Sequence, residues 1–307
     1  MLTRAYPGNL PGYAYSRAEI CYNVYDNNPM TEKRIRMDSY SGRIVAAGGG
    51  GNGSITPEGE QKPPVELAEI DREIIRLSGA KHPHVLVMAH AQIRSGPETE
   101  KKAAGAVIGT FEEMFGCESR MLSVSDVTDD PVRTRELLEW ADIIYEGGGH
   151  TPAMMDFWTS TGFGDLLRRE WRSGKVMCGA SAGAICWFAS GNTDIAGYSD
   201  GDVNSIPGLG FVRAYFSPHC QNEGKRESEI SSVRSLGMVG LSVSNCSAVE
   251  IADGGFRVIK SVPADPDFRP YVLRTFWKDG EMYEEELEET EGFRPLDSIL
   301  EFRKTGE

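Results

Sequence analysis

The sequence lacks the features that mark several large classes of protein. It has no dense Lys or Arg stretch, and 32 basic against 46 acidic residues give a net charge of −14, so it lacks the basic surface that nucleic-acid binding requires. Its longest apolar runs, such as 85–89, are about a quarter of the roughly 20 residues of a membrane span, and no signal-peptide pattern opens the chain. These absences predict a cytoplasmic protein with neither nucleic-acid nor membrane partners.

Cysteine and histidine are also scarce. Six cysteines are spread through the chain without a Cys-x-x-Cys pair, which indicates neither a disulfide framework nor a zinc site. No pattern predicts a metal or a cofactor, and only five histidines are available as a general base. The remaining profile, 307 residues with 40% hydrophobic and 25% charged, is typical of a folded globular protein.

Strand and helix patterns alternate from residue 43 onward, whereas residues 1–42 show no useful periodicity and are interpreted as an N-terminal extension or arm. Strands are expected at 44–47, 85–88, 120–124, 142–145 and 175–178, and helices at 65–78, 98–115, 131–140, 151–158, 164–171 and 182–189. This alternation predicts one α/β domain over 43–307, doubly wound, with a mostly parallel sheet. Short strands and turns over residues 238–307 predict a β-rich C-terminal addition.

Glycine-rich turns follow several of the expected strands, and ligands of an open α/β sheet bind at the carboxyl ends of its strands. The first turn, 48–53, is followed by a loop containing prolines and not directly by a helix, so a nucleotide-binding loop is disfavoured. An active-site or structural turn is the preferred interpretation.

The most specific motif is Gly179-Ala180-Ser181-Ala182-Gly183, which lies between an expected strand and an expected helix. A nucleophile on a strained strand-to-helix turn requires very small neighbours, so that its hydroxyl projects while the backbone packs closely. The motif therefore predicts Ser181 as a nucleophile, with the amide of Ala182 directed at a developing oxyanion. A glycine-rich turn with an incidental serine is the alternative.

A second glycine turn, Gly147-Gly148-Gly149-His150, also joins a strand to a helix. Its amides are candidates for the second part of an oxyanion hole. His150 is interpreted either as a substrate contact or as a residue that caps the following helix through its backbone.

A serine nucleophile requires a general base, usually histidine. The pattern divides this role between His219 and His150, with His219 preferred because Pro218 stiffens the segment before it. The carboxylate that would orient the imidazole is left open among Asp194, Asp200, Asp202 and Glu223.

Taken together, the motifs Y-E-G-G-G-H-T, G-A-S-A-G-A-I-C-W-F and S-P-H-C, in this order over residues 42–256, resemble the dipeptidase E (aspartyl dipeptidase) family of serine peptidases, whose relatives include cyanophycinase. The resemblance implies a class-I-amidotransferase-like, flavodoxin-like fold without a cofactor. It also implies a Ser-His-Asp/Glu triad in the chain order serine, acid, histidine. Ser181 and His219 match the nucleophile and the base, Gly148, Gly149 and Ala182 the oxyanion region, and Asp194 the acid, with Asp202 and Glu223 as alternates.

The resemblance further implies a small peptide substrate with an N-terminal aspartate, whose side chain requires a cationic partner. Arg213, Lys225 and Arg226 flank the His219 segment and are the candidates, with Glu223 and His150 as further substrate contacts. His150 stands where the family typically has asparagine, which could alter specificity.

Two alternatives remain open. A cyanophycinase-like enzyme would cleave β-aspartyl-arginine units, and a non-catalytic binding domain would keep the serine turn only for packing. A class-I glutamine amidotransferase is disfavoured because position 181 holds serine and not cysteine. The oligomeric state, including a homo-oligomer, is left open, and the acidic run 281–291 is interpreted as a solvated face.

Overall fold

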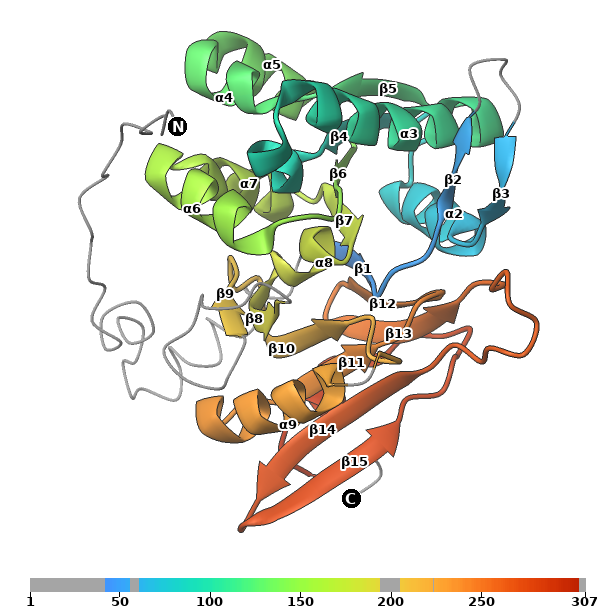
Figure 1. Cartoon of the computed structure of the whole chain (residues 1–307), viewed down its shortest axis with the longest axis vertical. Helices are drawn as coiled ribbons and strands as arrows, with labels where there is room; N and C mark the ends of the chain where they lie inside the picture. Colours follow the sequence, from blue (N-terminus) through green and yellow to red (C-terminus); the bar gives the residue numbers. More distant parts are fainter. Residues whose placement is uncertain (1–41, 56–60, 194–204, 223, 304–307) are drawn as a thin grey trace, which may run out of the picture. The chain divides into compact units, whose positions relative to one another are not determined.

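The computed structural model describes residues 42–55, 61–193, 205–222 and 224–303, all of which fall in the compact unit Ser39–Glu307. This unit contains two large mixed sheets and one hairpin (Figure 1). The fold is the expected α/β class, with mostly parallel strands covered by helices and an additional sheet that includes C-terminal strands.

The first sheet has eight strands in the order β16-β13-β12-β1-β7-β6-β4-β5. Its parallel half consists of β1 (Arg43–Ala47), β7 (Val176–Ala180), β6 (Ile143–Glu146), β4 (His84–Met88) and β5 (Glu118–Met121). Its antiparallel half consists of β12 (Ser247–Ala252), β13 (Gly255–Lys260) and β16 (Arg294–Pro295). The C-terminal strands therefore extend the first sheet directly.

Both faces of the parallel half are buried because successive side chains of a strand point to opposite faces. In β1, Ile44 and Ala46 pack into one apolar cluster, and Val45 and Ala47 pack into the other. One face is covered by α2 (Ala68–Ser78) and α3 (Pro97–Phe115), and the other by α5 (Pro131–Trp140), α6 (Thr151–Thr161) and α7 (Phe163–Arg172) (Figure 1).

The second sheet has six strands in the order β15-β14-β11-β10-β8-β9. They are β15 (Glu281–Glu286), β14 (Val272–Lys278), β11 (Gly240–Val243), β10 (Val212–Pro218), β8 (Phe188–Asn192) and β9 (Ser205–Pro207). The helix α9 (Lys225–Leu236) packs on this sheet (Figure 1). The remaining elements are β2 (Asn52–Ile55), β3 (Gln61–Val65), the 3-10 helix η1 (His90–Ser95), α4 (Val124–Asp129), α8 (Ala182–Ile185) and α10 (Asp297–Leu300).

The strand expected over 120–124 lies at Glu118–Met121, and Val124 instead begins α4. Two expected helices also have wrong boundaries. The helix expected over 182–189 ends at Ile185, because Phe188–Asn192 instead forms β8 and pairs with β10 and β9. The helix expected over 65–78 begins at Ala68, because Gln61–Val65 pairs with β2 in a hairpin. In both places pairing with a strand elsewhere in the chain overrides the local helical pattern.

The acidic run differs in part from a purely solvated face. Glu285 pairs with the buried Arg274, and Lys260 pairs with Glu286 at 3.4 Å. β15 is an edge strand in which exposed and half-buried positions mostly alternate, so one row of its side chains can reach cations on neighbouring elements.

Candidate active site

Ser181 occupies a strained turn between β7 and α8. Its backbone has φ 57° and ψ −119°, a left-handed conformation that is unusual for a residue with a side chain. Its N–H donates to the carbonyl of Ala47 at 3.2 Å, at the end of the adjacent strand β1. The half-buried Ser181 is therefore held at the carboxyl edge of the parallel strands, where the sequence motif placed it.

The two glycines of the motif are required by close packing. A Cβ at Gly179 or at Gly183 would overlap the backbone carbonyl of Glu146 at the end of β6. Gly179 also has φ 154°, which favours glycine. The small residues around Ser181 therefore allow the turn to lie directly against the neighbouring strand, as the spacing predicts.

The loop after β6 lies beside this turn. A Cβ built on Gly148 would be 3.4 Å from Ser181 Cβ and 3.9 Å from its Oγ. The N–H groups of Gly147 and His150 donate to the carbonyls of Met88 and Ala91. The N–H groups of Gly148, Gly149 and Ala182, in contrast, have no hydrogen-bond acceptor among the described residues. These three amides are the ones available to an oxyanion next to Ser181.

A side chain of η1 supports the loop after β6. Gln92 Nε2 donates to the carbonyl oxygen of Gly148 at 2.8 Å. Because C=O and N–H point in opposite directions across a trans peptide, this bond turns the N–H of Gly149 away from Gln92. Sequence analysis did not identify Gln92 as a residue of the site, because its contact with Gly148 spans 56 residues.

His150 caps the helix that follows the loop. Its Nδ1 accepts a hydrogen bond from the N–H of Ala153 at 3.1 Å, at the start of α6. The backbone carbonyl of His150 also accepts from the N–H of Met154 at 3.2 Å, so the expected backbone cap is present, and the side chain adds a second cap that was not expected. Since Nδ1 accepts, the proton of the neutral ring lies on Nε2, and a substrate contact through that atom stays a prediction.

His219 follows β10 and reaches the same edge. It has φ 53°, and its N–H donates to the carbonyl of Gly48 at 3.1 Å. Ser181 and His219 are thus bound to two consecutive carbonyls, those of Ala47 and Gly48. Both residues are therefore anchored at the end of β1, on two neighbouring positions of the chain.

Asn245 contacts the imidazole of His219. The distance between His219 Nδ1 and Asn245 Oδ1 is 2.7 Å. The contact follows from strand register, because Pro218 of β10 pairs in parallel with Val243 of β11, so the residues just beyond each strand end lie side by side. Sequence analysis missed Asn245, although the ends of two adjacent parallel strands are where such a pair would be sought.

The first glycine turn, residues 48–53, has a structural role beside His219. A Cβ at Gly49 would overlap both the His219 ring and Asn245 Oδ1, and a Cβ at Gly48 would overlap the carbonyls of Val243 and Ser244. The carbonyl of Gly49 accepts from the N–H of Cys246 at 2.9 Å. The turn thus packs against the His219–Asn245 pair, which agrees with the preferred interpretation of an active-site or structural turn.

The carboxylates expected as the third triad member, Asp194, Asp202 and Glu223, and the further candidate Asp200, lie outside the described residues. Within the described part, the partner of His219 Nδ1 is Asn245, which follows the histidine in the chain. The order serine, acid, histidine, which rests on these carboxylates, stays a prediction.

The candidate cations differ in their surroundings. Arg226 pairs with Glu229 at 2.9 Å and with Glu284, and its guanidinium also donates to Ser242 Oγ at 2.8 Å. These contacts hold the guanidinium of Arg226, on α9, against the second sheet, and its role as a substrate cation stays a prediction. Arg213 is exposed on β10, and Lys225 begins α9; a substrate role for either stays a prediction.

The histidine at the end of β4 is a core residue. His90 is fully buried, its Nδ1 accepts from Trp158 Nε1 at 3.0 Å, and its Nε2 lies 3.0 Å from the carbonyl of Leu122. Burial lowers the pKa of His90 to about 4, so the ring is neutral near pH 7. Its two nitrogens are both engaged, and it does not serve as a base.

One buried carboxyl lies beneath the site. Glu146, at the end of β6, is fully buried and accepts from the N–H of Ala91 at 3.1 Å through Oε1. Burial raises the pKa of Glu146 well above its usual range. Burial therefore favours the neutral form of this carboxyl beneath the serine turn.

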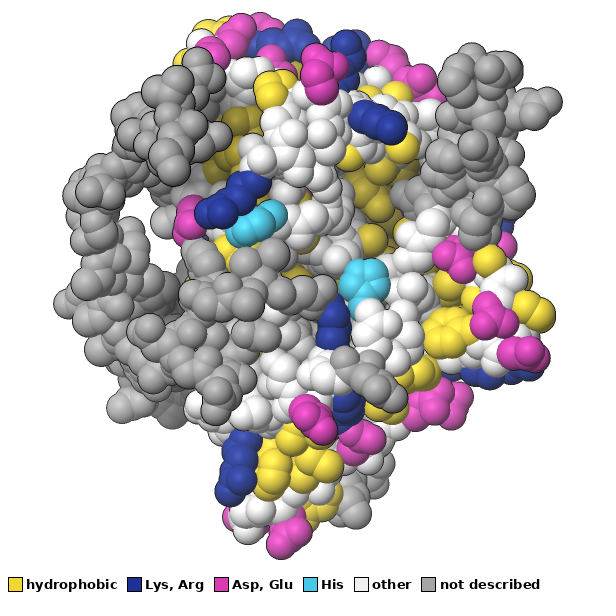
Figure 2. All heavy atoms as spheres, viewed as in Figure 1, with side chains coloured by type: hydrophobic (Ala, Val, Ile, Leu, Met, Phe, Trp, Pro, Cys, Tyr) yellow, Lys and Arg dark blue, Asp and Glu magenta, His cyan; other side chains and the backbone are white. Residues whose placement is uncertain are grey.

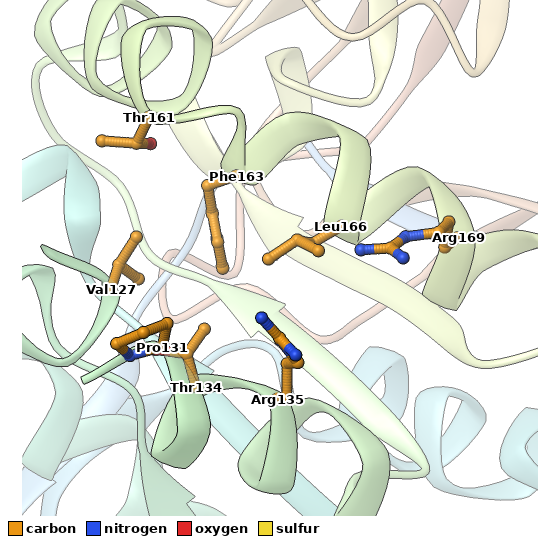
Figure 3. Close-up of a pocket in the computed structure, with 8 residues that line it drawn as sticks. All are labelled: Val127, Pro131, Thr134, Arg135, Thr161, Phe163, Leu166 and Arg169. Atoms are coloured by element: carbon orange, nitrogen blue, oxygen red, sulfur yellow. The ribbon is translucent and has the colours of Figure 1, made fainter.

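A cavity of about 400 Å³ lies elsewhere, among α4, α5, the end of α6 and α7 (Figure 3). Its lining includes neither Ser181 nor His219 nor any residue of the loop 147–150.

The described residues contain no cluster of three His, Cys, Asp or Glu placed to hold a metal ion. On the face in Figure 2, described basic and acidic side chains are interspersed and form no continuous basic area.

The chain belongs to peptidase family S51, whose model matches residues 55–259. It is also 44% identical over 85 residues to a protein of Bacillus subtilis (strain 168) described as an uncharacterized peptidase, YgaJ. That match covers 28% of this chain and 35% of the relative's length. The family match therefore places the chain among the members of a peptidase family.

Two solved structures share the fold. One is a peptidase from an acI-B1 Actinobacterium, with a TM-score of 0.60 and 18% identity over 85% of this chain and 99% of that one. The other is a putative peptidase E protein from Listeria monocytogenes EGD-e, with a TM-score of 0.52 and 16% identity over 72% of this chain and 99% of that one. No helix among the described residues is long and apolar enough to cross a membrane.

Proposed function

We propose that this chain is a serine-type exopeptidase similar to dipeptidase E, which hydrolyses short peptides and removes an N-terminal aspartate. The observation that supports the proposal is the strained turn of Ser181, beside which the amides of Ala182, Gly148 and Gly149 lack acceptors among the described residues. Membership of peptidase family S51 supports the same chemistry.

In the proposed reaction, Ser181 Oγ attacks the peptide carbonyl carbon while its proton passes to His219 Nε2. The carbonyl π pair becomes the oxyanion, which the free amides stabilise. The C–N bond then breaks, and the Nε2 proton passes to the leaving amine, leaving an acyl-enzyme. Water hydrolyses this ester by the same steps, with His219 again accepting and returning the proton.

The preference for an N-terminal aspartate rests on the family resemblance. A cation is needed to bind that side chain in a protein of net charge −14. Arg213, Lys225 and Arg226 are the candidates, and Arg226 is also bound to Glu229 and Glu284. Glu223 and His150 are proposed as further contacts with the peptide.

The test compares the wild-type chain with Ser181→Ala on α-linked Asp-Xaa, Glu-Xaa and neutral dipeptides, Asp-started tripeptides and β-Asp-Arg. Products are identified by mass spectrometry. We expect cleavage of Asp-Xaa that falls below detection in Ser181→Ala, since removing a triad member costs about 10⁶-fold in kcat. Ser160→Ala, an exposed serine on α6, is the matched control and should keep full activity.

Other outcomes point elsewhere. Turnover of β-Asp-Arg alone would indicate a cyanophycinase-like hydrolase. Full activity of Ser181→Ala would exclude the proposed nucleophile. If none of these substrates is cleaved and Ser181 does not react with a fluorophosphonate, a non-catalytic binding domain is favoured.

A further inference from the structure

The cavity among α4, α5, α6 and α7 has charged lining residues of one sign. Its volume of about 400 Å³ falls in the range of small-molecule sites. Its charged residues are Arg135 of α5 and Arg169 of α7, and no acidic residue of the described chain lines it. Most of the remaining lining is apolar, namely Val127, Pro131, Phe163 and Leu166. The cavity therefore combines an apolar wall with two positive charges.

The two guanidiniums are directed at the same part of the cavity. In Figure 3, Arg135 extends from α5 and Arg169 from α7, and both guanidiniums approach Leu166, which lies between them. Neither side chain has a hydrogen bond or an ion pair with a described residue. Both are exposed, so a ligand can reach them from solvent.

The arginines that precede them on the same two helices are, in contrast, engaged. Arg133 of α5 pairs with Asp126 at 2.9 Å. Arg168 of α7 donates to the carbonyl of Leu209, and its guanidinium lies 4.9 Å from the centre of the Phe211 ring. A guanidinium carries five N–H donors and no acceptor. Arg135 and Arg169 therefore keep their donors for a group from outside the described fold.

The hydroxyl groups of the lining are already used. Thr134 Oγ1 donates to the carbonyl of Asp126 at 2.9 Å, and Thr161 Oγ1 donates to the carbonyl of Phe157 at 2.7 Å. The unengaged side-chain donors of the lining are thus the two guanidiniums. Their planar N–H forks match the oxygens of a carboxylate or a phosphate, and an anion between them would offset the repulsion of two like charges.

We propose that this cavity binds a small organic anion, with its carboxylate or phosphate on Arg135 and Arg169 and its apolar part against Phe163 and Leu166. The site is separate from the one around Ser181 and does not rest on the proposed function. Because the chain as a whole carries a net charge of −14, the two guanidiniums have to supply the local attraction. Binding should therefore weaken as the salt concentration rises.

The test titrates the isotope-labelled chain with small probes and follows its NMR chemical shifts. Phenyl phosphate and phenylacetate represent the two anions, inorganic phosphate lacks the apolar part, and benzyl alcohol lacks the charge. We expect phenyl phosphate to shift the signals of residues 134–135 and 163–169. It should bind about 10-fold more tightly than benzyl alcohol, since hydrogen bonds to charged groups are lost with the alcohol. It should also bind about 10-fold more tightly than inorganic phosphate, since the ring buries apolar surface.

Variants of the lining separate the two parts of the ligand. Arg135→Gln and Arg169→Gln should each weaken binding of phenyl phosphate about 10-fold, and Arg169→Lys, which keeps the charge, should lose less. Leu166→Ala should weaken binding of phenyl phosphate but not of inorganic phosphate. Arg172→Gln, on the same helix α7 but outside the lining, is the matched control and should bind like the wild-type chain.

Several outcomes would overturn the proposal. They are no shift of the lining signals with any probe, unchanged binding when Arg135→Gln and Arg169→Gln are combined, and equal affinities for phenyl phosphate and benzyl alcohol. Equal affinities for phenyl phosphate and inorganic phosphate would overturn the organic part of the ligand. Urea unfolding of each variant checks that it is folded.

The site around Ser181 is tested separately. Ser181→Ala should bind phenyl phosphate as tightly as the wild-type chain, because Ser181 does not line the cavity. A loss of binding in Ser181→Ala would show that the probe binds at the serine turn and would contradict the proposal. Since peptide cleavage is not the readout, failure of the proposed function would leave this result unchanged.

Discussion

At the scale of single residues, the site depends on the direction of backbone amides. Ser181 supplies one group to the reaction, but the groups that would stabilise the oxyanion are N–H donors of Ala182 and of the loop after β6. A hydrogen bond that turns a peptide plane can therefore matter for catalysis without touching the substrate. Gln92, which holds the carbonyl of Gly148, is such a residue.

Gln92→Ala should lower kcat about 10-fold with little change in KM, less than the roughly 10²–10³-fold loss from removing an oxyanion donor outright. The reason is that the Gly148–Gly149 peptide would lose its brace, and the oxyanion forms only in the transition state. Steady-state kinetics on the best dipeptide measures both constants.

Ser95→Ala, an exposed residue at the end of the same 3-10 helix, is the control. A change confined to KM in Gln92→Ala would show that the side chain acts on substrate binding and not on the oxyanion.

At the scale of elements, the site is assembled where the two sheets meet. β7 and β6 of the first sheet bring Ser181 and the glycine loop, while β10 and β11 of the second sheet bring His219 and Asn245. The turn after β1 joins them, because its carbonyls hold both Ser181 and His219. This turn should be more sensitive to substitution than its glycine-rich composition alone suggests.

Gly49→Ala should lower activity about 100-fold or more, at least the effect of losing a general base. The new Cβ would overlap the His219 ring and Asn245 Oδ1. It would also sit at φ 150°, a strained conformation that costs about 1–3 kcal/mol of stability. Activity assays and urea unfolding measure the two effects.

Gly105→Ala provides the contrast, since Gly105 is exposed inside α3 and its Cβ would meet nothing within 4 Å. This change should stabilise the chain by roughly 0.5–1 kcal/mol and leave activity unchanged. Wild-type activity of Gly49→Ala would show that the turn does not set the position of His219.

At the scale of the whole molecule, one apolar cluster includes strand residues of both sheets, such as Ile44 and Leu86 of the first and Phe216 and Leu241 of the second. We therefore expect a charge buried anywhere in the compact unit Ser39–Glu307 to lower its free energy of unfolding. Asp71 of α2 is 1% exposed, and neither of its carboxyl oxygens has a hydrogen-bond partner in the described part of the chain.

Burial raises the pKa of Asp71 to about 8, whereas an unfolded aspartate titrates at about 3.9. Between these values the unfolded chain is ionised while the folded chain stays protonated. The contribution of Asp71 to the stability of the folded state is therefore largest below about pH 4, falls as pH rises toward 8, and levels off above it, with a slope of up to about 1.4 kcal/mol per pH unit.

Asp71→Asn should remove this slope and be increasingly more stable than the wild-type chain between pH 5 and pH 8. Urea unfolding at pH 5, 6.5 and 8 measures the difference. Asp129→Asn, an exposed aspartate, is the control. Equal pH slopes for Asp71→Asn and the wild-type chain would contradict the prediction.

The sequence by itself determined the features that depend on neighbouring residues. Alternating strand and helix patterns predicted β1, β4 to β7 and the helices α2, α3, α5, α6 and α7, because a side-chain period is a local property. The Gly179 to Gly183 motif predicted the strained serine turn, because only small side chains permit that close packing. Sequence analysis did not predict the polar helix α9. Its buried residues are Glu229, Ser232 and Val233, so it lacks an apolar stripe of helical period.

Only the tertiary structure decided which distant residues meet. The pairing of β10 with β11 places Asn245 on His219, and the second sheet turns 188–192 from the expected helix into a strand. Arg226 was a plausible substrate cation in sequence and is bound to Glu229 and Glu284 in the fold. Such contacts depend on strand order and register between segments far apart in the chain, which no local pattern contains.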